Sequence, residues 1–229
     1  MPEYGFFIPK TFSLGIKGGY EVDWTYGASF DTKSQDLLEG EGYGYNALSQ
    51  FGVLTLNFVD RIELFGLLGA HSFQWEQERK EGGHISYHVD PSLAWGVGGR
   101  ALLAYWEDFH LSINASYVSS SPSSVRALAD TVRDWSSDIH FNAWQVGGGF
   151  SYQFAWFVPY VGVDYINETI ETGHFSSPLL PQNGFTFNLK NPFGIYLGLG
   201  ICVQKGWNLN IEARFINEEA LSGSFDLKF

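Results

Sequence analysis

Apolar and polar residues alternate along short segments of this chain. Such alternation is typical of β-strands whose two faces meet different surroundings. The clearest case is the segment from Thr11 to Trp24. One face of it carries Phe12, Leu14, Ile16, Tyr20, Val22 and Trp24, and the other carries Ser13, Gly15, Lys17, Glu21 and Asp23. We therefore expect one face in an apolar medium and one in a polar medium.

The same period returns at seven further places, in residues 93–105, 109–117, 144–154, 161–165, 193–201, 209–215 and 220–229. Two other segments are less regular. Residues 47–58 alternate only near their end, and in residues 62–75 either face could be the apolar one. Together the segments predict about ten strands of roughly ten residues, the length that crosses a bilayer at the tilt of a membrane barrel.

The connections between these segments alternate in length. Short turns are predicted at 59–61, 107–108, 155–157 and 205–207, and long polar loops at 27–46, 76–91, 119–138 and 167–192. Outer-membrane barrels have short periplasmic turns and long extracellular loops. The sequence therefore predicts an all-β, antiparallel transmembrane β-barrel, with residues 1–10 as an N-terminal periplasmic segment and residues 11–229 as a single barrel domain.

Aromatic residues collect near both ends of the predicted strands, as expected for rings at the two membrane interfaces. Phe58, Trp106, Trp156 and Trp207 lie beside the short turns, and Trp24, Trp75, Tyr117, Trp144 and Tyr165 lie near the long loops. A general preference of aromatics for strands does not explain this clustering. The soluble alternative is a lipocalin-type barrel with an apolar interior. Alternation alone does not decide which face is outside, but the two aromatic girdles favour a membrane barrel.

Composition narrows the possible functions. Aromatic and charged residues each make up 17% of the chain, and soluble domains carry roughly 25% charged residues. A net charge of −12 excludes nucleic acid as a partner, because phosphate binding needs clustered Lys and Arg. A transmembrane helix needs about 18 consecutive apolar residues, and no run approaches that length. The single cysteine, Cys202, forms no intrachain disulfide. The amino end lacks the features of a secretory signal. Either a signal was removed or the protein is not exported, and we expect removal.

Four blocks of sequence resemble the chlamydial major outer membrane protein family of porins. The segment from Phe12 to Tyr26 resembles its first strand, and LTLNFVDRIELFGLLGA (Leu54 to Ala70) resembles its hairpin with an aspartate-arginine turn. More specific are AWGVGGRALLAYWE (Ala94 to Glu107) and AWQVGGGFSYQFAWFVPYVGVDY (Ala143 to Tyr165). The closing segment, EARFINEEALSGSFDLKF (Glu212 to Phe229), is also similar. The likeness covers most strands in order and leaves the long loops unmatched.

This resemblance implies an outer-membrane pore that is assembled by the barrel-assembly machinery through the aromatic strand ending at Phe229, with a homotrimer as its candidate oligomeric state. Two departures matter. The family is cysteine-rich and cross-linked, whereas this chain has one cysteine, and this chain is much shorter. A ten-stranded barrel has a narrow bore that inward side chains can fill, since open aqueous lumens come with roughly 16 or more strands.

Charged residues on the polar faces are the predicted pore lining: Lys17, Glu21, Asp23, Arg100, His110, Asp164, Glu212, Arg214, Asp226 and Lys228. They could form rings that select ions, or ion pairs that plug a small lumen. Both roles place them inside the barrel.

Other candidate sites are weaker. His84 and His88 have ligand-like spacing without a third partner. Asp134, Asp138 and His140 lie close together at a predicted loop-to-strand junction, where a carboxylate and a histidine could activate water, but most such neighbours are solvated loop residues. We therefore predict no catalytic residue, metal or cofactor. The sequence predicts a porin for passive diffusion of small solutes or ions, with outer-membrane lipid around it. The alternative is a closed barrel that acts in adhesion or in envelope structure through its loops.

Overall fold

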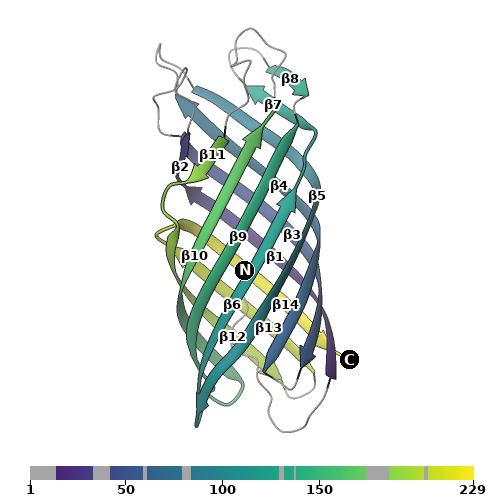
Figure 1. The fold of residues 1–229 in the computed structure, drawn as a ribbon, viewed down its shortest axis with the longest axis vertical. Helices are drawn as coiled ribbons and strands as arrows, with labels where there is room; N and C mark the ends of the chain where they lie inside the picture. The colour runs from purple at the N-terminus through teal and green to yellow at the C-terminus, as the bar shows by residue number, and fades with distance from the viewer. Residues whose placement is uncertain are drawn as a thin grey trace.

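Every strand belongs to one antiparallel sheet that closes on itself (Figure 1). This computed structural model describes residues 14–32, 42–58, 61–78, 84–128, 132–136, 138–173, 186–203 and 206–229. The predicted segment 1–10 lies outside these residues. The strands are β1 (Leu14–Ala28), β2 (Phe30–Thr32), β3 (Gly42–Phe58), β4 (Ile62–Glu78), β5 (His84–Trp106), β6 (Phe109–Ser120), β7 (Ser124–Leu128), β8 (Val132–Ser136), β9 (Ile139–Tyr152), β10 (Phe157–Thr172), β11 (Thr186–Leu189), β12 (Phe193–Val203), β13 (Trp207–Phe215) and β14 (Glu218–Lys228). The described residues contain no helix long and apolar enough to span a membrane.

Ten of these strands form a closed ring in the order β1-β3-β4-β5-β6-β9-β10-β12-β13-β14. The ring closes where β14 pairs with β1, from Lys17 opposite Lys228 to Ala28 opposite Glu218. The prediction of an antiparallel barrel of about ten strands is confirmed. We call the end that carries the β3–β4, β5–β6, β9–β10 and β12–β13 connections the turn end, and the opposite end the loop end.

The outer surface of this ring is apolar. Leu14, Trp24, Leu68, Leu93, Val163 and Phe193 each expose about half of the side chain or more. Between them on the same strands lie buried polar residues such as Lys17 and Asp164. The predicted outward face of the first segment is confirmed for its described part. The hydrophobic effect keeps such a surface out of water, so the ring is built to sit in lipid, and we call it the membrane tier.

The sheet continues beyond this ring at the loop end. There β11 pairs with β10 and β2, and β2 pairs with β3, so that β11 and β2 bridge the space above β12, β13, β14 and β1. On the other side β7 pairs with β5, and β8 pairs with β7. We call this part the outer tier: β2, β7, β8 and β11 with residues 42–47, 72–78, 84–90, 139–143 and 167–172. The sequence predicts loops throughout four segments, 27–46, 76–91, 119–138 and 167–192. This prediction is wrong, because each segment contains strand residues.

The two faces exchange character in the outer tier. Its interior is an apolar cluster that includes Phe30, Tyr45, Phe73, Trp75, Tyr87, Val89, Val125, Ile139, Phe141, Ile170, Phe187 and Leu189. Its outward residues are polar, among them Asn46, Gln74, Glu76, His88, Arg126, His140, Asn142 and Glu171. This arrangement is that of a soluble barrel in water.

One predicted girdle residue is misplaced for this reason. Trp75 is buried inside the outer tier and stacks on Tyr87 with 4.6 Å between the ring centroids. Trp24, Trp95, Trp106, Trp144 and Trp156 are exposed on the surface instead. Segment 62–75, whose orientation the sequence left open, has apolar residues on both faces: Ile62, Leu64 and Leu68 outside, and Phe65, Leu67 and Phe73 inside. Its inner apolar residues cover part of the lumen wall.

Candidate functional site: the barrel lumen

The inward side chains of the membrane tier form the candidate site. Because side chains alternate along a strand, every second residue of the ring projects into the lumen. The buried polar and charged residues of β1, β3, β4, β5, β6, β9, β10, β13 and β14 gather there. The ion pairs among them form two clusters, one near each end of the tier.

The cluster near the turn end is centred on Glu63 of β4. Its Oε1 accepts hydrogen bonds from the Lys17 ammonium and from Asn57 Nδ2, the latter at 2.9 Å. Its Oε2 accepts from Arg100 Nη1 at 2.9 Å. The pairing of Glu63 with Arg100 across β4 and β5, and with Asn57 across β3 and β4, places these groups together. One carboxylate thus binds two buried cations.

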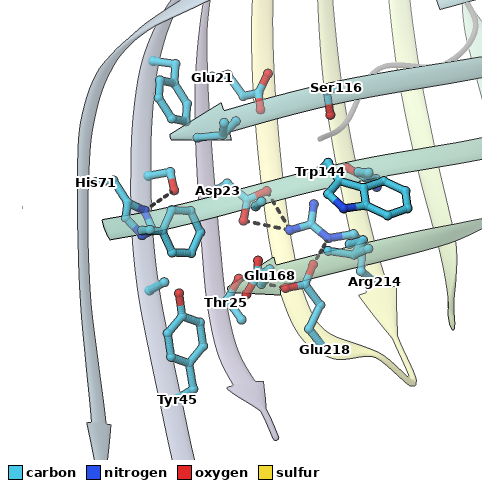
Figure 2. A pocket seen from close by; sticks show the side chains of 18 residues that line it. Glu21, Asp23, Thr25, Tyr45, His71, Ser116, Trp144, Glu168, Arg214 and Glu218 are labelled. Carbon is cyan, nitrogen blue, oxygen red and sulfur yellow. Dashed lines mark hydrogen bonds and ion pairs between the residues drawn. The ribbon is translucent and has the colours of Figure 1, made fainter. Parts of the chain in front are cut away.

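The cluster near the loop end is centred on Arg214 of β13, whose side chain is 4% exposed (Figure 2). Its Nη2 donates to both carboxylate oxygens of Asp23, at 2.8 and 2.7 Å. Its Nε donates to Glu218 Oε1 at 2.6 Å, and its Nη1 lies 3.7 Å from Glu212 Oε1. Thr25 Oγ1 donates to the other oxygen of Glu218 at 3.3 Å. Here one guanidinium is surrounded by carboxylates.

Aromatic rings narrow the lumen between β10 and β12. Tyr160 and Tyr196 project inward with 6.2 Å between their ring centroids. Each ring lies over a glycine of the neighbouring strand: a Cβ at Gly198 would collide with Tyr160, and one at Gly162 would collide with Tyr196. Glycine at these two positions therefore lets the rings lie flat against the wall of the barrel.

The predicted pore-lining residues can now be placed. Those that lie buried in the lumen are Lys17, Glu21, Arg100, Asp164, Glu212, Arg214 and Asp226. Asp23 and His110 are partly buried, and Lys228 is exposed at the last position of β14. The Glu63 cluster contains Lys17 and Arg100, and the Arg214 cluster contains Asp23 and Glu212. Outside these two clusters, Gln145 Nε2 donates a hydrogen bond to Asp164 Oδ2 at 2.9 Å.

Sequence reasoning missed three carboxylates of this site. Glu63 lies in the segment of uncertain orientation, Glu168 in a predicted loop, and Glu218 between the predicted strands 209–215 and 220–229. All three are buried. The signal that could have found Glu63 is its place two residues after the aspartate-arginine turn, on the face opposite Ile62 and Leu64.

A cavity of about 70 Å³ lies inside the barrel where the polar lumen meets the apolar interior of the outer tier. Its lining includes Glu21, Asp23, Thr25, Tyr45, Ser49, Phe51, His71, Phe141, Glu168, Arg214 and Glu218. The lumen therefore contains two ion-pair clusters and an internal space.

The other candidate groups do not converge into a site in the described residues. His88 is half-buried on the outward face, and the side chain of His84 lies outside the described part. Asp138 and His140 are exposed, and His140 Nδ1 lies 3.1 Å from Ser121 Oγ; the side chain of Asp134 is outside the described part. The absence of a cofactor, metal and catalytic site stays a prediction.

The sequence was compared with those of known proteins. No family model matches the chain. It is similar to the major outer membrane porin of Chlamydia pneumoniae: three sequences of that name are each 22% identical, over 95% of this chain and 79% of the porin. The identity is low, but the match runs along nearly the whole barrel.

Solved structures with a similar fold are also outer-membrane barrels. The β domain of the Bordetella autotransporter BrkA has a TM-score of 0.51 at 13% identity, covering 95% of this chain and all of that chain. The outer membrane protease OmpT from Escherichia coli has a TM-score of 0.45 at 9% identity, covering 96% of this chain and 99% of that chain. At these identities structural likeness shows the fold alone. The chain is thus an outer-membrane β-barrel protein whose sequence is similar to porins.

Proposed function

We propose that this protein is a narrow porin through which small solutes or ions cross the outer membrane passively. The observation that carries the proposal is the charged lumen. Among the described buried residues, three cations (Lys17, Arg100, Arg214) and seven carboxylates (Glu21, Glu63, Asp164, Glu168, Glu212, Glu218, Asp226) are found within the barrel. Ionisable groups at membrane depth are energetically costly and often mark ion or solute pathways.

The charge balance supports a preference for cations. Carboxylates outnumber cationic groups in the lumen by more than two to one, and a lining of one sign attracts the opposite ion. The porins with similar sequence support passive transport. The narrow bore of a ten-stranded barrel limits the solute to small molecules.

A closed barrel is the second candidate, and the packing of the lumen favours it. The Glu63 cluster, the two tyrosines and the apolar cluster of the outer tier all project into the bore. A barrel that stays closed would serve as an anchor for its loop-end segments, in adhesion or envelope structure. Neither candidate requires a catalytic group, and we propose that the protein is not an enzyme.

Planar bilayer recordings separate the two candidates. The purified protein should give small ohmic current steps, with a reversal potential in a salt gradient that indicates cation preference. Arg100→Gln removes one lumen cation and should increase that preference, whereas Lys190→Gln, at an exposed position beyond β11, should leave it unchanged. If no steps occur at high protein loading, the porin proposal fails and the closed barrel stands.

A further inference from the structure

The internal cavity has two chemically different sides (Figure 2). In this view Asp23, Glu168, Arg214 and Glu218 lie on one side, and Tyr45 and His71 on the other. The polar side belongs to β1, β10, β13 and β14, and the aromatic side belongs to β3 and β4 with Phe141 of β9. Both sides line the same space of about 70 Å³, which is large enough for a few water molecules or one small solute.

The polar side carries an excess of negative charge. Arg214 is already hydrogen-bonded to Asp23 and Glu218. Glu168 lines the same cavity and is only 9% exposed, and its Oε2 has no hydrogen-bond partner in the described part of the chain. A buried carboxylate oxygen left without a partner costs free energy. It is therefore suited to accept a hydrogen bond from a cation in the cavity.

The aromatic side has two more polar atoms that are buried without a hydrogen-bond partner in the described residues. Tyr45 and His71 are each 2% exposed, and within the described residues the Tyr45 hydroxyl and His71 Nε2 have no hydrogen-bond partner. His71 Nδ1 lies 2.9 Å from Ser49 Oγ. When Nδ1–H donates to Ser49, Nε2 becomes an acceptor. The rings of Phe51 and Phe141 line the cavity beside these atoms.

We propose that this cavity binds one small protonated amine. An ammonium group has three N–H donors, and Glu168, Tyr45 and His71 each supply an acceptor that has no other partner among the described residues. The neighbouring aromatic rings stabilise an organic cation through their π faces. A calcium ion, in contrast, takes six to eight oxygen ligands, and this donor set includes a phenol and a ring nitrogen. The inference names the solute class for the lumen and rests on the proposed function for the route of entry.

Isothermal titration calorimetry of the full chain in detergent micelles tests the site, with methylammonium chloride as the probe and sodium chloride and calcium chloride as comparisons at equal ionic strength. Methylammonium should bind at one site and at least tenfold more tightly than sodium. Glu168→Gln keeps the side-chain shape and should weaken binding at least tenfold. Tyr45→Phe should weaken it severalfold. Glu171→Gln, an exposed position on the same strand, is the matched control and should bind as the wild type does.

Folding of each variant is checked by the shift in gel mobility on heating. If Glu168→Gln does not fold, Tyr45→Phe carries the test. Three results would overturn the proposal: no saturable binding of methylammonium, equal affinity for methylammonium in Glu168→Gln and the wild type, or binding of calcium alone. The titration measures binding and requires no current. Binding without conductance would refute the porin proposal and support the amine site. Conductance without binding would refute the amine site and support the porin proposal.

Discussion

The membrane tier and the outer tier share strands but present opposite faces to their surroundings. Strand β10 shows this most simply. Its outward residues are Val161, Val163 and Tyr165 in the membrane tier, followed by Asn167, Thr169 and Glu171 in the outer tier. Its inward residues over the same length are Asp164, Ile166, Glu168 and Ile170, so the interior becomes more apolar along the strand while Glu168 remains as a charged residue in the outer tier. The strand geometry is constant, and the medium outside the barrel determines which residues belong on each face.

This comparison explains how one fold supports two kinds of interior. Where lipid covers the outside, the apolar residues face lipid and the lumen takes the polar groups. Where water covers the outside, the apolar residues must be buried inside, and the interior becomes a hydrophobic core. The charged lumen therefore lies mainly in the membrane tier and reaches the outer tier at Glu168, where the apolar cluster of the outer tier adjoins it.

The largest expected effect comes from breaking the ion-pair cluster of the membrane tier. Glu63→Ala removes the carboxylate that Lys17 and Arg100 share and should lower the free energy of unfolding by about 4 kcal/mol, because two buried cations lose their counterion. Denaturant unfolding in micelles, followed by tryptophan fluorescence, measures this change. Glu76→Ala, exposed on the same strand in the outer tier, should change it by less than about 0.5 kcal/mol. Similar losses of unfolding free energy in both variants would contradict the role of Glu63 as the shared counterion of Lys17 and Arg100.

A smaller effect is expected from truncating the apolar core of the outer tier. Phe141 is buried and packs against His71 at 4.3 Å and Phe73 at 5.9 Å between ring centroids. Phe141→Ala leaves a cavity and should cost about 3 kcal/mol. Phe150 lies on the same strand but is 51% exposed on the membrane tier. Phe150→Ala should cost less, since detergent tails fill the vacated space. The same unfolding assay compares the free energies of unfolding of the two variants. An equal loss in both, or a larger loss in Phe150→Ala, would argue against a packed outer tier.

The smallest of the three effects concerns the outward faces. Val161→Lys places a charge on the lipid-facing surface and should lower the free energy of unfolding in lipid bilayers by about 2 kcal/mol. Glu171 faces outward on the same strand in the outer tier. The free energy of unfolding of Glu171→Lys should therefore be within about 0.5 kcal/mol of the wild-type value. Urea titration of vesicle-inserted protein measures both. Equal sensitivity would mean that lipid reaches Glu171.

The local pattern predicted the membrane tier well and the outer tier poorly. Period-two alternation identified the strand from Phe109 to Tyr117 and the lipid-facing set of Leu93, Trp95 and Val97. It could not show that Tyr87 and Val89 face inward, because alternation has the same form when the medium outside changes from lipid to water. Trp75 was assigned to a girdle for that reason.

The ion-pair clusters were beyond local prediction in a different way. Lys17 meets Glu63 across 46 residues and Asp23 meets Arg214 across 191, and only the register of the closed sheet brings these partners together. The sequence placed Lys17, Asp23, Arg100 and Arg214 on inward faces, because that requires only the strand period. It did not include Glu168, since the strand that carries this residue extends into a segment polar enough to be predicted as a loop.

The most direct test of the two-tier account is the depth of single fluorescent labels on β10. In a Cys202→Ser background, a label at Val161→Cys should be quenched by brominated lipid and shielded from aqueous iodide. A label at Glu171→Cys should be quenched by iodide and unaffected by brominated lipid. Equal quenching of both labels by brominated lipid would contradict the account, because it would place the outer tier within the membrane.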